Sequence, residues 1–320
     1  MKVKRIVTAS AILMMLAAAT AGCGSGQSHG QSRSTQSQSA QLPALGPIPT
    51  ITALTQISRP IDPYVPTAAQ VKELYQAIDS VTVRCVKSYG LPPMPTASAD
   101  FDDVALQNRA RNQLYGFFDP EVMAAKGYDV NAIMAGRPAQ PTEAEIAVLS
   151  GRSTTGAVVT TYNGRPIPAG GCHQVGLDAV GGDPPTPGTG ISLPDGGPPV
   201  PIGDPRVVSV DTRWSACMKA KGYSYANPAD AYTDAKWRPA TTNQSDPDAS
   251  LNREEIATAT TDLACKQETH LMGVAIAVQS AYDRQYIASH SNALSAFKKQ
   301  LEDRVNKAAQ IIAAGGTAIG

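Results

Sequence analysis

Charged and aromatic residues are scarce in this 320-residue chain, at 17% and 5% of the composition. Basic and acidic residues each number 27, so the chain has no surplus of positive charge. Three of the basic residues, Lys2, Lys4 and Arg5, lie at the very start, which leaves the remainder slightly acidic. A nucleic-acid partner needs a strongly basic patch. We therefore expect no such partner, and no attraction to an anionic membrane surface.

The sequence also lacks the short motifs that mark common enzymes and metal sites. It contains no Gly-x-Ser-x-Gly, no His-Glu-x-x-His, no phosphate loop and no Cys-x-x-Cys pair. Cys172 and His173 are the only adjacent pair of soft ligands. His270 and His290 are twenty residues apart on one expected helix, or about 30 Å, too far to share an ion. We expect no metal and no other cofactor, and the sequence does not indicate an enzyme.

Two pairs of adjacent acidic residues occur, Asp102-Asp103 and Glu254-Glu255. Both lie where a helix is expected to begin, and carboxylates there interact favourably with the helix dipole. We interpret them as solvated first turns rather than as catalytic pairs.

The N-terminus has the features of an export and lipidation signal. Residues 6–19 form an apolar run behind the basic residues, too short to span a bilayer but typical of a secretion signal. Ala21 and Gly22 then precede Cys23, which resembles the lipobox of bacterial lipoproteins, although Thr20 stands where leucine is usual. We predict a signal peptide over residues 1–22 and lipidation of Cys23. The alternative is an ordinary cleaved signal followed by an unmodified cysteine.

Two acyl chains on one residue give stable anchoring, so the predicted location is the outer face of the cytoplasmic membrane. Residues 24–41 contain no large apolar side chain, and such a segment cannot offset its own ordering entropy. We expect residues 23–50 to form a flexible tether between the membrane anchor and the folded body.

Without Cys23 the chain has an even set of four cysteines: Cys85, Cys172, Cys217 and Cys265. Two of them open similar stretches, "CVKSYGL" and "CMKAKGY", in which a glycine that ends a helix follows five residues after the cysteine. Four cysteines allow three connectivities. The most economical one joins Cys85 to Cys172 and Cys217 to Cys265, while pairings across the two halves, such as Cys85 to Cys217, stay open.

Helical periodicity with recognisable start and stop signals recurs along the rest of the chain. Thr67 with Gln70, and Thr142 with Glu145, form capping-box patterns. Asp119 and Asn227 each precede a proline, as at many helix N-termini. The helices expected from such signals cover residues 67–90, 102–115, 119–127, 142–151, 207–222 and 228–237. A small hairpin is expected to turn at Asn163-Gly164.

Residues 181–205 contain eight prolines and seven glycines, so we expect a linker or a long loop there. It separates a first helical subregion, residues 51–180, from a second, residues 206–320. Residues 251–314 contain no proline and predict one long helix, or two helices broken near His290, with Gly273 as a possible weak point. The far end of this C-terminal helix could meet a protein partner.

Four aromatic residues lie near the second cysteine stretch: Trp214, Tyr223, Tyr225 and Trp237. They could line a groove for a small ligand. Packing in a hydrophobic core is the alternative, and we favour it.

Four stretches carry a family resemblance: "NQLYGFFDPEVMAAKGYD", "YNGRPIPAGGC", "WSACMKAKGYSYANPADA" and "ATTDLACKQET". Together they resemble an actinomycete family of secreted or lipid-anchored proteins of unknown function, over most of residues 60–300. The resemblance implies export and a four-cysteine arrangement, and it implies no activity. Family members continue beyond "GGC" with a longer helix than "HQVGLDAVGG" permits here.

The sequence therefore predicts a mainly α protein: an irregular helical bundle with long loops, a long C-terminal helix and two disulfides. The function expected is that of a bacterial cell-surface lipoprotein, acting as a non-catalytic interaction or envelope-associated module. The alternative is an extracellular lipoprotein that binds a small ligand.

Overall fold

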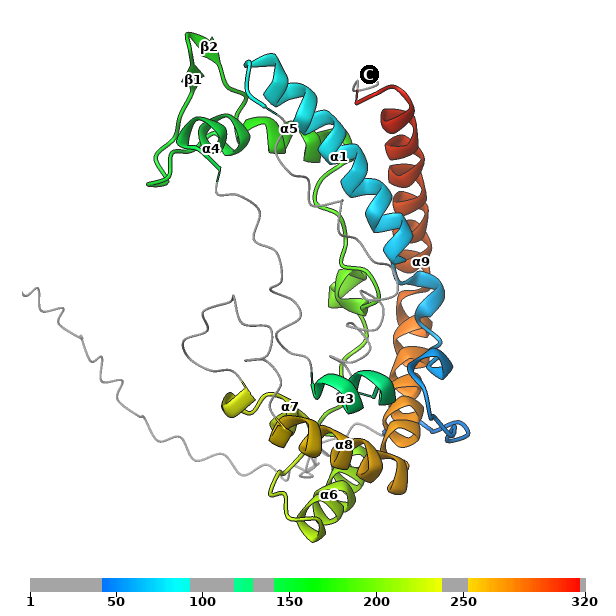
Figure 1. Ribbon diagram of the computed structural model, residues 1–320. Coiled ribbons are helices and arrows are strands. Elements are labelled where there is room, and N and C mark those ends of the chain that lie inside the picture. Colours follow the sequence, from blue (N-terminus) through cyan, green and yellow to red (C-terminus); the bar gives the residue numbers. More distant parts are fainter. Residues whose placement is uncertain (1–41, 93–117, 129–140, 238–252, 317–320) are drawn as a thin grey trace, which may run out of the picture. The chain divides into compact units, whose positions relative to one another are not determined.

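The computed structural model describes residues 42–92, 118–128, 141–237 and 253–316, and the chain is mainly helical there, as predicted (Figure 1). The helices are α1 (Ala68–Ser88), α3 (Pro120–Lys126), α4 (Glu143–Ser150), α5 (Gly171–Ala179), α6 (Pro205–Ala220), α7 (Pro228–Tyr232), α8 (Arg253–Glu268) and α9 (Leu271–Ala313). Strands β1 (Thr161–Tyr162) and β2 (Arg165–Pro166) form one antiparallel pair. The chain from Pro43 onward forms one compact unit.

Side-chain caps begin the helices where the sequence predicts them. The Thr67 hydroxyl accepts a hydrogen bond from the Gln70 backbone at 3.2 Å, and the Gln70 side chain accepts one from the Thr67 backbone at 3.0 Å. Thr142 and Glu145 repeat this reciprocal pattern at the start of α4. These caps satisfy backbone N–H groups that have no partner inside the helix. The expected helix over residues 102–115 lies outside the described residues.

The hairpin also forms as predicted. Asn163 and Gly164 connect β1 to β2 with φ values of 48° and 74°, the left-handed pair that a tight two-residue turn requires.

Helix α9 has 43 residues and contacts the other helices along most of its length. In Figure 1, α1 lies beside its C-terminal half, while α6 and α8 lie at its other end. Leu301, Ala308 and Ile311 of α9 are buried in a cluster with Leu74 and Ile78 of α1. In the C-terminal part of α9, the apolar face of the helix is therefore covered by α1. No helix in the described ranges is long and apolar enough to cross a membrane.

The chain breaks at two places in residues 251–314, and the sequence predicts only one of them, the kink at His290. The chain turns at Thr269 and His270, and His270 adopts a left-handed conformation with φ 54° between α8 and α9. His290 leaves helical geometry, with φ −122° and ψ 17°, but α9 continues beyond it. The break at Thr269 and His270 contains no glycine or proline, so no local sequence signal marks it.

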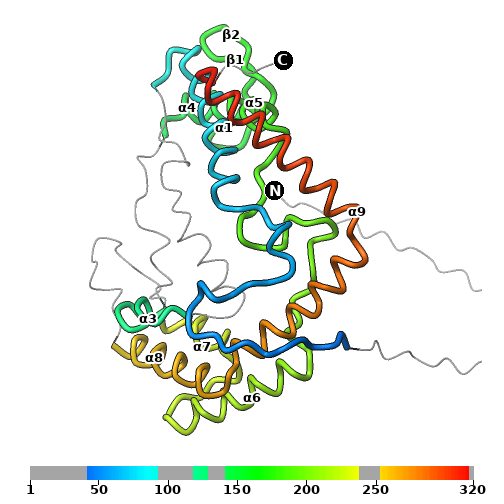
Figure 2. Tube along the Cα trace, turned by 90° about the vertical axis from the view of Figure 1, so that its right-hand side faces the viewer, coloured from blue at the N-terminus to red at the C-terminus, as the bar shows by residue number. Residues whose placement is uncertain are grey.

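Gly273 has a packing role and does not break the helix. A Cβ added at this position would collide with the carbonyl oxygen of Pro49, so its missing side chain lets the N-terminal segment approach α9. In Figure 2 this segment, coloured dark blue, runs beside the first turns of α9.

Residues 43–50, which the composition assigned to the tether, therefore contact the helices. The next residues anchor the segment further, because Ile51, Leu54, Ile57 and Ile61 are buried.

The segment over residues 181–204 forms neither an α-helix nor a strand, but it lies against α9. Leu193 is buried in a cluster with Tyr286 and Leu294. The Tyr286 hydroxyl donates to the Pro194 carbonyl at 2.5 Å, and the Gln279 amide donates to the Pro199 carbonyl at 3.1 Å. These contacts hold the loop along the long helix.

Candidate functional site

Two disulfides join the four cysteines in the pairing that the order of the sequence favoured. Cys85 of α1 is bonded to Cys172 of α5, with Cα atoms 5.5 Å apart. Cys217 of α6 is bonded to Cys265 of α8, with Cα atoms 5.7 Å apart. Each disulfide cross-links two helices within one half of the chain.

The first disulfide lies where α1 and α5 pack closely. A Cβ at Gly176 would meet the Thr82 hydroxyl at 2.6 Å and the Ile78 carbonyl oxygen at 2.8 Å. Only glycine therefore fits at this crossing. Cys172 is buried with Val86, and the Thr82 hydroxyl lies 3.5 Å from the Cys172 carbonyl oxygen.

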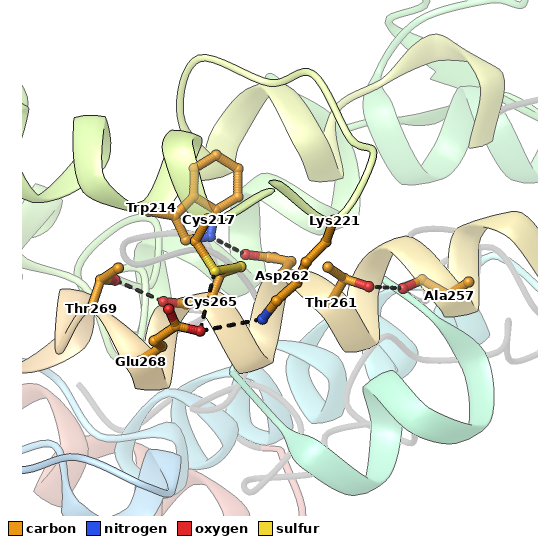
Figure 3. Close-up of a disulfide and its surroundings, with 9 residues drawn as sticks. All are labelled: Trp214, Cys217, Lys221, Ala257, Thr261, Asp262, Cys265, Glu268 and Thr269. Carbon is orange, nitrogen blue, oxygen red and sulfur yellow. Dashed lines mark hydrogen bonds and ion pairs between the residues drawn. A yellow bond between two sulfur atoms is a disulfide. The ribbon is translucent and has the colours of Figure 1, made fainter. Parts of the chain in front are cut away.

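The second disulfide lies beside a buried polar cluster that the sequence reasoning missed. Figure 3 shows Asp262 and Trp214 next to the Cys217–Cys265 bond. The Asp262 carboxylate accepts hydrogen bonds from the Trp214 indole at 2.8 Å, the Lys266 ammonium at 2.7 Å and the Tyr128 hydroxyl at 3.3 Å. We call these four residues, Tyr128, Trp214, Asp262 and Lys266, the Asp262 cluster. The sequence did contain a hint of this cluster. Asp262 and Lys266 are four residues apart and so lie on the same face of a helix, and both are within three residues of Cys265.

The Asp262 cluster is sealed from solvent: none of its residues is more than 1% exposed. Burial raises the pKa of the Asp262 carboxyl and lowers the pKa of the Lys266 ammonium, because removal from water disfavours both charges. Burial and the neighbouring Asp262 carboxylate also raise the pKa of the Tyr128 hydroxyl. Groups with no path to solvent cannot meet a substrate, so this cluster stabilises the packing of α3, α6 and α8.

Asp211 on α6 is the titratable group at the edge of this cluster. Burial raises the pKa of its carboxyl from 3.8 to about 6, although the Lys266 charge lowers it. Between these pH values the folded chain holds a proton that the unfolded chain has lost. Asp211 therefore makes the folded state less stable as the pH rises from about 4 to about 6.

Replacing Asp211 with Asn tests this effect. Asparagine does not titrate, so the stability of Asp211→Asn relative to the wild type should increase from pH 4 to pH 6 and then level off at higher pH. Urea unfolding of both proteins between pH 4 and pH 8 measures the difference, in which groups common to both cancel. A difference that is constant over this range would contradict the prediction.

The structure places the four aromatic residues near the second cysteine stretch in the hydrophobic core, the interpretation that the sequence favoured over a ligand groove. Trp214 and Trp237 are buried, and Tyr223 and Tyr225 pack against the same core. The Trp237 indole donates to the Ala231 carbonyl at 2.7 Å, and the Tyr225 hydroxyl donates to Asp234 at 3.0 Å. The four aromatic residues do come together, and they do so as part of one hydrophobic core.

The interpretation of Glu254-Glu255 as a solvated turn is wrong for Glu255. Its side chain is buried and accepts a hydrogen bond from the Tyr128 backbone at 3.0 Å, close against Gly127. Glu254 is exposed and forms an ion pair with Lys236 at 2.7 Å. The chain turns sharply at Gly127, with φ 70°, and Glu255 receives the backbone donor that the turn presents. Asp102-Asp103 lies outside the described residues.

The histidines also lie differently from expectation. His270 is the turn residue between α8 and α9, not part of a helix. His173 is exposed on α5, and its neighbour Cys172 is bound in a disulfide. No group of three or more metal-ligating side chains occurs within the described residues.

One constellation contains the residue types of a catalytic triad. His290 Nδ1 lies 2.8 Å from the Ser289 hydroxyl, and its Nε2 lies 3.3 Å from Asp195. The Ser289 hydroxyl, however, also lies 3.1 Å from the Gln285 carbonyl oxygen, as in an ordinary helical serine. Asp195 is exposed, whereas the carboxylate of a working triad is buried. We interpret the group as the contact that holds the 190–197 loop to the kink of α9.

The described surface includes shallow cavities, of which two are formed by α9 and its neighbours. One, of about 430 Å³, lies between α1 and the end of α9, and Lys72, Glu73 and Ile312 are among its lining residues. The other, of about 400 Å³, lies between α9 and residues 46–60, with Arg59 and Arg284 in its wall. The Arg59 guanidinium is held by Asp283 at 2.5 Å inside the protein. None of the four aromatic residues of the predicted groove lines either cavity.

Comparison with models of protein families, with curated proteins and with solved structures finds no match to this chain. Function therefore has to be inferred from the chain itself.

Proposed function

We propose that the protein is an exported lipoprotein whose helical body acts as a non-catalytic interaction or envelope-associated module. In this proposal the signal over residues 1–22 is removed, Cys23 carries the lipid, and the body is held at the outer face of the cytoplasmic membrane. The resemblance to an actinomycete family of exported proteins points in the same direction.

The pairing of the cysteines is the observation that carries the proposal. The structure places four of the five cysteines in two disulfides, which leaves Cys23 as the remaining one. Disulfides of this kind persist in oxidising compartments and are rare in a reducing cytosol. An unmodified thiol in such a compartment is reactive, and acylation of Cys23 removes it.

A non-catalytic role is supported by the pairing of buried carboxylates with cations inside the protein. The buried carboxylates Asp262 and Asp283 both face cations inside the protein. The small-ligand alternative loses its predicted site, because the aromatic residues of the groove belong to the core. A protein partner at the C-terminal helix stays a prediction, and Ile312 is the large apolar side chain exposed near that end.

The test is replacement of Cys23 with Ala. We expect the wild-type protein in the membrane fraction, with the intact mass of a diacylated mature chain beginning at Cys23, and the Cys23→Ala protein in the medium. The reason is that two acyl chains hold a protein stably at a bilayer whereas a bare polypeptide terminus does not. Ser25→Ala, which leaves the cysteine in place, serves as the matched control. An unmodified N-terminus on the wild-type protein, or an unchanged membrane fraction for Cys23→Ala, would contradict the proposal.

A further inference from the structure

Large apolar side chains are exposed at one turn of the protein. Val200, Ile202 and Val208 are 52%, 78% and 49% exposed, and they lie within nine residues at the entrance to α6. We call these three side chains the 200–208 patch. Single exposed apolar residues are ordinary, but a group of them suggests a surface that binds something.

Polar contacts beneath the 200–208 patch hold the turn in place. The Ile202 backbone donates to the Val200 carbonyl at 2.9 Å. Asp204, buried at the start of α6, accepts hydrogen bonds from the Arg206 backbone at 2.9 Å and its guanidinium at 2.6 Å. Tyr282 of α9 donates to the same carboxylate at 3.3 Å. The backbone is therefore anchored to α9 while the apolar side chains of the turn remain exposed.

The chain from the proposed lipid anchor enters the folded unit at this same turn. The Arg206 guanidinium donates to the carbonyl oxygen of Pro43 at 2.8 Å, so Pro43 lies beside the N-terminus of α6. Nineteen residues separate Cys23 from Pro43. A coil of that length has a root-mean-square span of about 25 Å. A lipid on Cys23 would thus keep the 200–208 patch near the bilayer.

The charges of α6 also suit a surface of anionic phospholipid. The helix carries three cationic residues, Arg206, Arg213 and Lys219, and one acidic residue, Asp211, and Arg206 is paired with Asp204 just before the helix at 2.6 Å. Arg213 and Lys219 are exposed, whereas Asp211 is partly buried. The balanced charge of the whole chain conceals this local excess of positive charge. Exposed apolar side chains and exposed cations on one helix form a combination that binds at a membrane interface.

We propose that the 200–208 patch contacts the membrane that bears the anchor. Val200, Ile202 and Val208 enter the boundary between headgroups and acyl chains, and Arg213 and Lys219 meet the lipid phosphates. This inference rests on the proposed function, because the lipid on Cys23 is what brings the chain to the bilayer. The anchor supplies the high effective concentration that makes such a contact persist. Together, anchor and patch would fix which face of the protein points away from the membrane.

The inference is tested without the lipid. The chain from residue 23 with Cys23→Ser is mixed with vesicles of phosphatidylglycerol and phosphatidylcholine, or of phosphatidylcholine alone, and bound protein is measured by co-sedimentation. We expect binding to the anionic vesicles that weakens with salt. Adding Ile202→Ser and Val208→Ser should weaken it about tenfold, because two apolar side chains no longer leave water. The matched control, Val158→Ser with Ile312→Ser, removes two other exposed apolar side chains and should stay within about twofold of the parent.

Several outcomes would overturn the inference. They are the absence of binding to anionic vesicles, equal binding by the patch variant and its parent, or a concentration-dependent dimer that Ile202→Ser with Val208→Ser abolishes. The last result would assign the patch to a second copy of the chain.

The outcome is separable from that of the proposed function. Loss of vesicle binding with a lipidated Cys23 rejects only the patch, and vesicle binding with an unmodified Cys23 rejects only the lipid anchor. Amide hydrogen exchange of the wild-type lipoprotein in vesicles gives a second measurement. Residues 200–208 should exchange more slowly than they do in detergent-free buffer with the Cys23→Ser chain, and equal exchange would count against the contact.

Discussion

Replacing Asp262 with Ala should lower the free energy of unfolding by about 3–5 kcal/mol, the range seen when one member of a buried ion pair is removed. The change takes away the carboxylate to which Trp214, Lys266 and Tyr128 all donate. It also removes the anion closest to the Lys266 ammonium, which is completely buried. Urea unfolding at pH 7, followed by circular dichroism, measures the loss.

A nearby exposed ion pair provides the control. Lys221 lies 3.3 Å from Glu268, and the two side chains are 41% and 65% exposed. Figure 3 shows this pair near the same disulfide. Lys221→Ala should change the stability by about 0.5 kcal/mol or less, because water screens an exposed pair. If Asp262→Ala lowered the free energy of unfolding no more than Lys221→Ala does, the Asp262 cluster would not stabilise the packing of α3, α6 and α8.

A ranking within the cluster sharpens the test. Lys266→Met should cost less than Asp262→Ala, since it removes one donor from a carboxylate that keeps the Trp214 and Tyr128 donors. The methionine also fills much of the space that the lysine stem occupied, whereas the alanine leaves a cavity. The reverse order would indicate that the positive charge of Lys266 matters more than the acceptor.

Removing either disulfide should be comparably costly. In the chain-entropy model the Cys217–Cys265 bond, with a sequence separation of 48, contributes about 4 kcal/mol. The Cys85–Cys172 bond, with a separation of 87, contributes about 4.6 kcal/mol. Domains are typically stable by only about 5–15 kcal/mol. We therefore expect each double Cys→Ala variant to fold with a lower melting temperature, and the variant without either disulfide to be unfolded at 37 °C.

Addition of reductant separates the disulfide effect from the effect of alanine itself. Reduced wild-type protein should melt where the quadruple variant does, and reductant should not change the melting of the quadruple variant. Peptide mapping without reduction should recover Cys85 linked to Cys172. A peptide that links Cys85 to Cys217, or a variant as stable as the wild type, would contradict the assigned pairing.

We expect large effects from these substitutions because much of the core is built of small side chains, so each cross-link and buried ion pair contributes a larger share of the stability. Aromatic residues make up only 5% of the chain, and cores of small side chains bury less area per residue. Trp214 is the largest fully buried side chain, and its indole donates to Asp262 next to the Cys217–Cys265 bond (Figure 3). Cross-links and one buried ion pair thus stabilise the end of the protein where α6 and α8 meet.

The amino-acid sequence alone determined the features that depend on neighbouring residues. The capping boxes at Thr67 and Thr142 and the turn at Asn163-Gly164 involve short-range chemistry. Hydrogen bonds across three residues and left-handed turns are encoded locally. For this reason the helical class and most helix ends could be predicted. The disulfide pairing is long-range, and it was favoured because it is the most economical of three connectivities.

Only the tertiary structure decided which polar groups are buried and which apolar groups are exposed. The local pattern predicts no role for Asp262 and Lys266, which lie one turn apart on α8, yet Trp214 of α6 and Tyr128 after α3 enclose them. Nothing in the sequence marks Ile202 as exposed, yet it remains at the surface because Asp204 anchors the turn that contains it. Burial depends on contacts between segments far apart in the chain, and a local pattern contains no record of those partners.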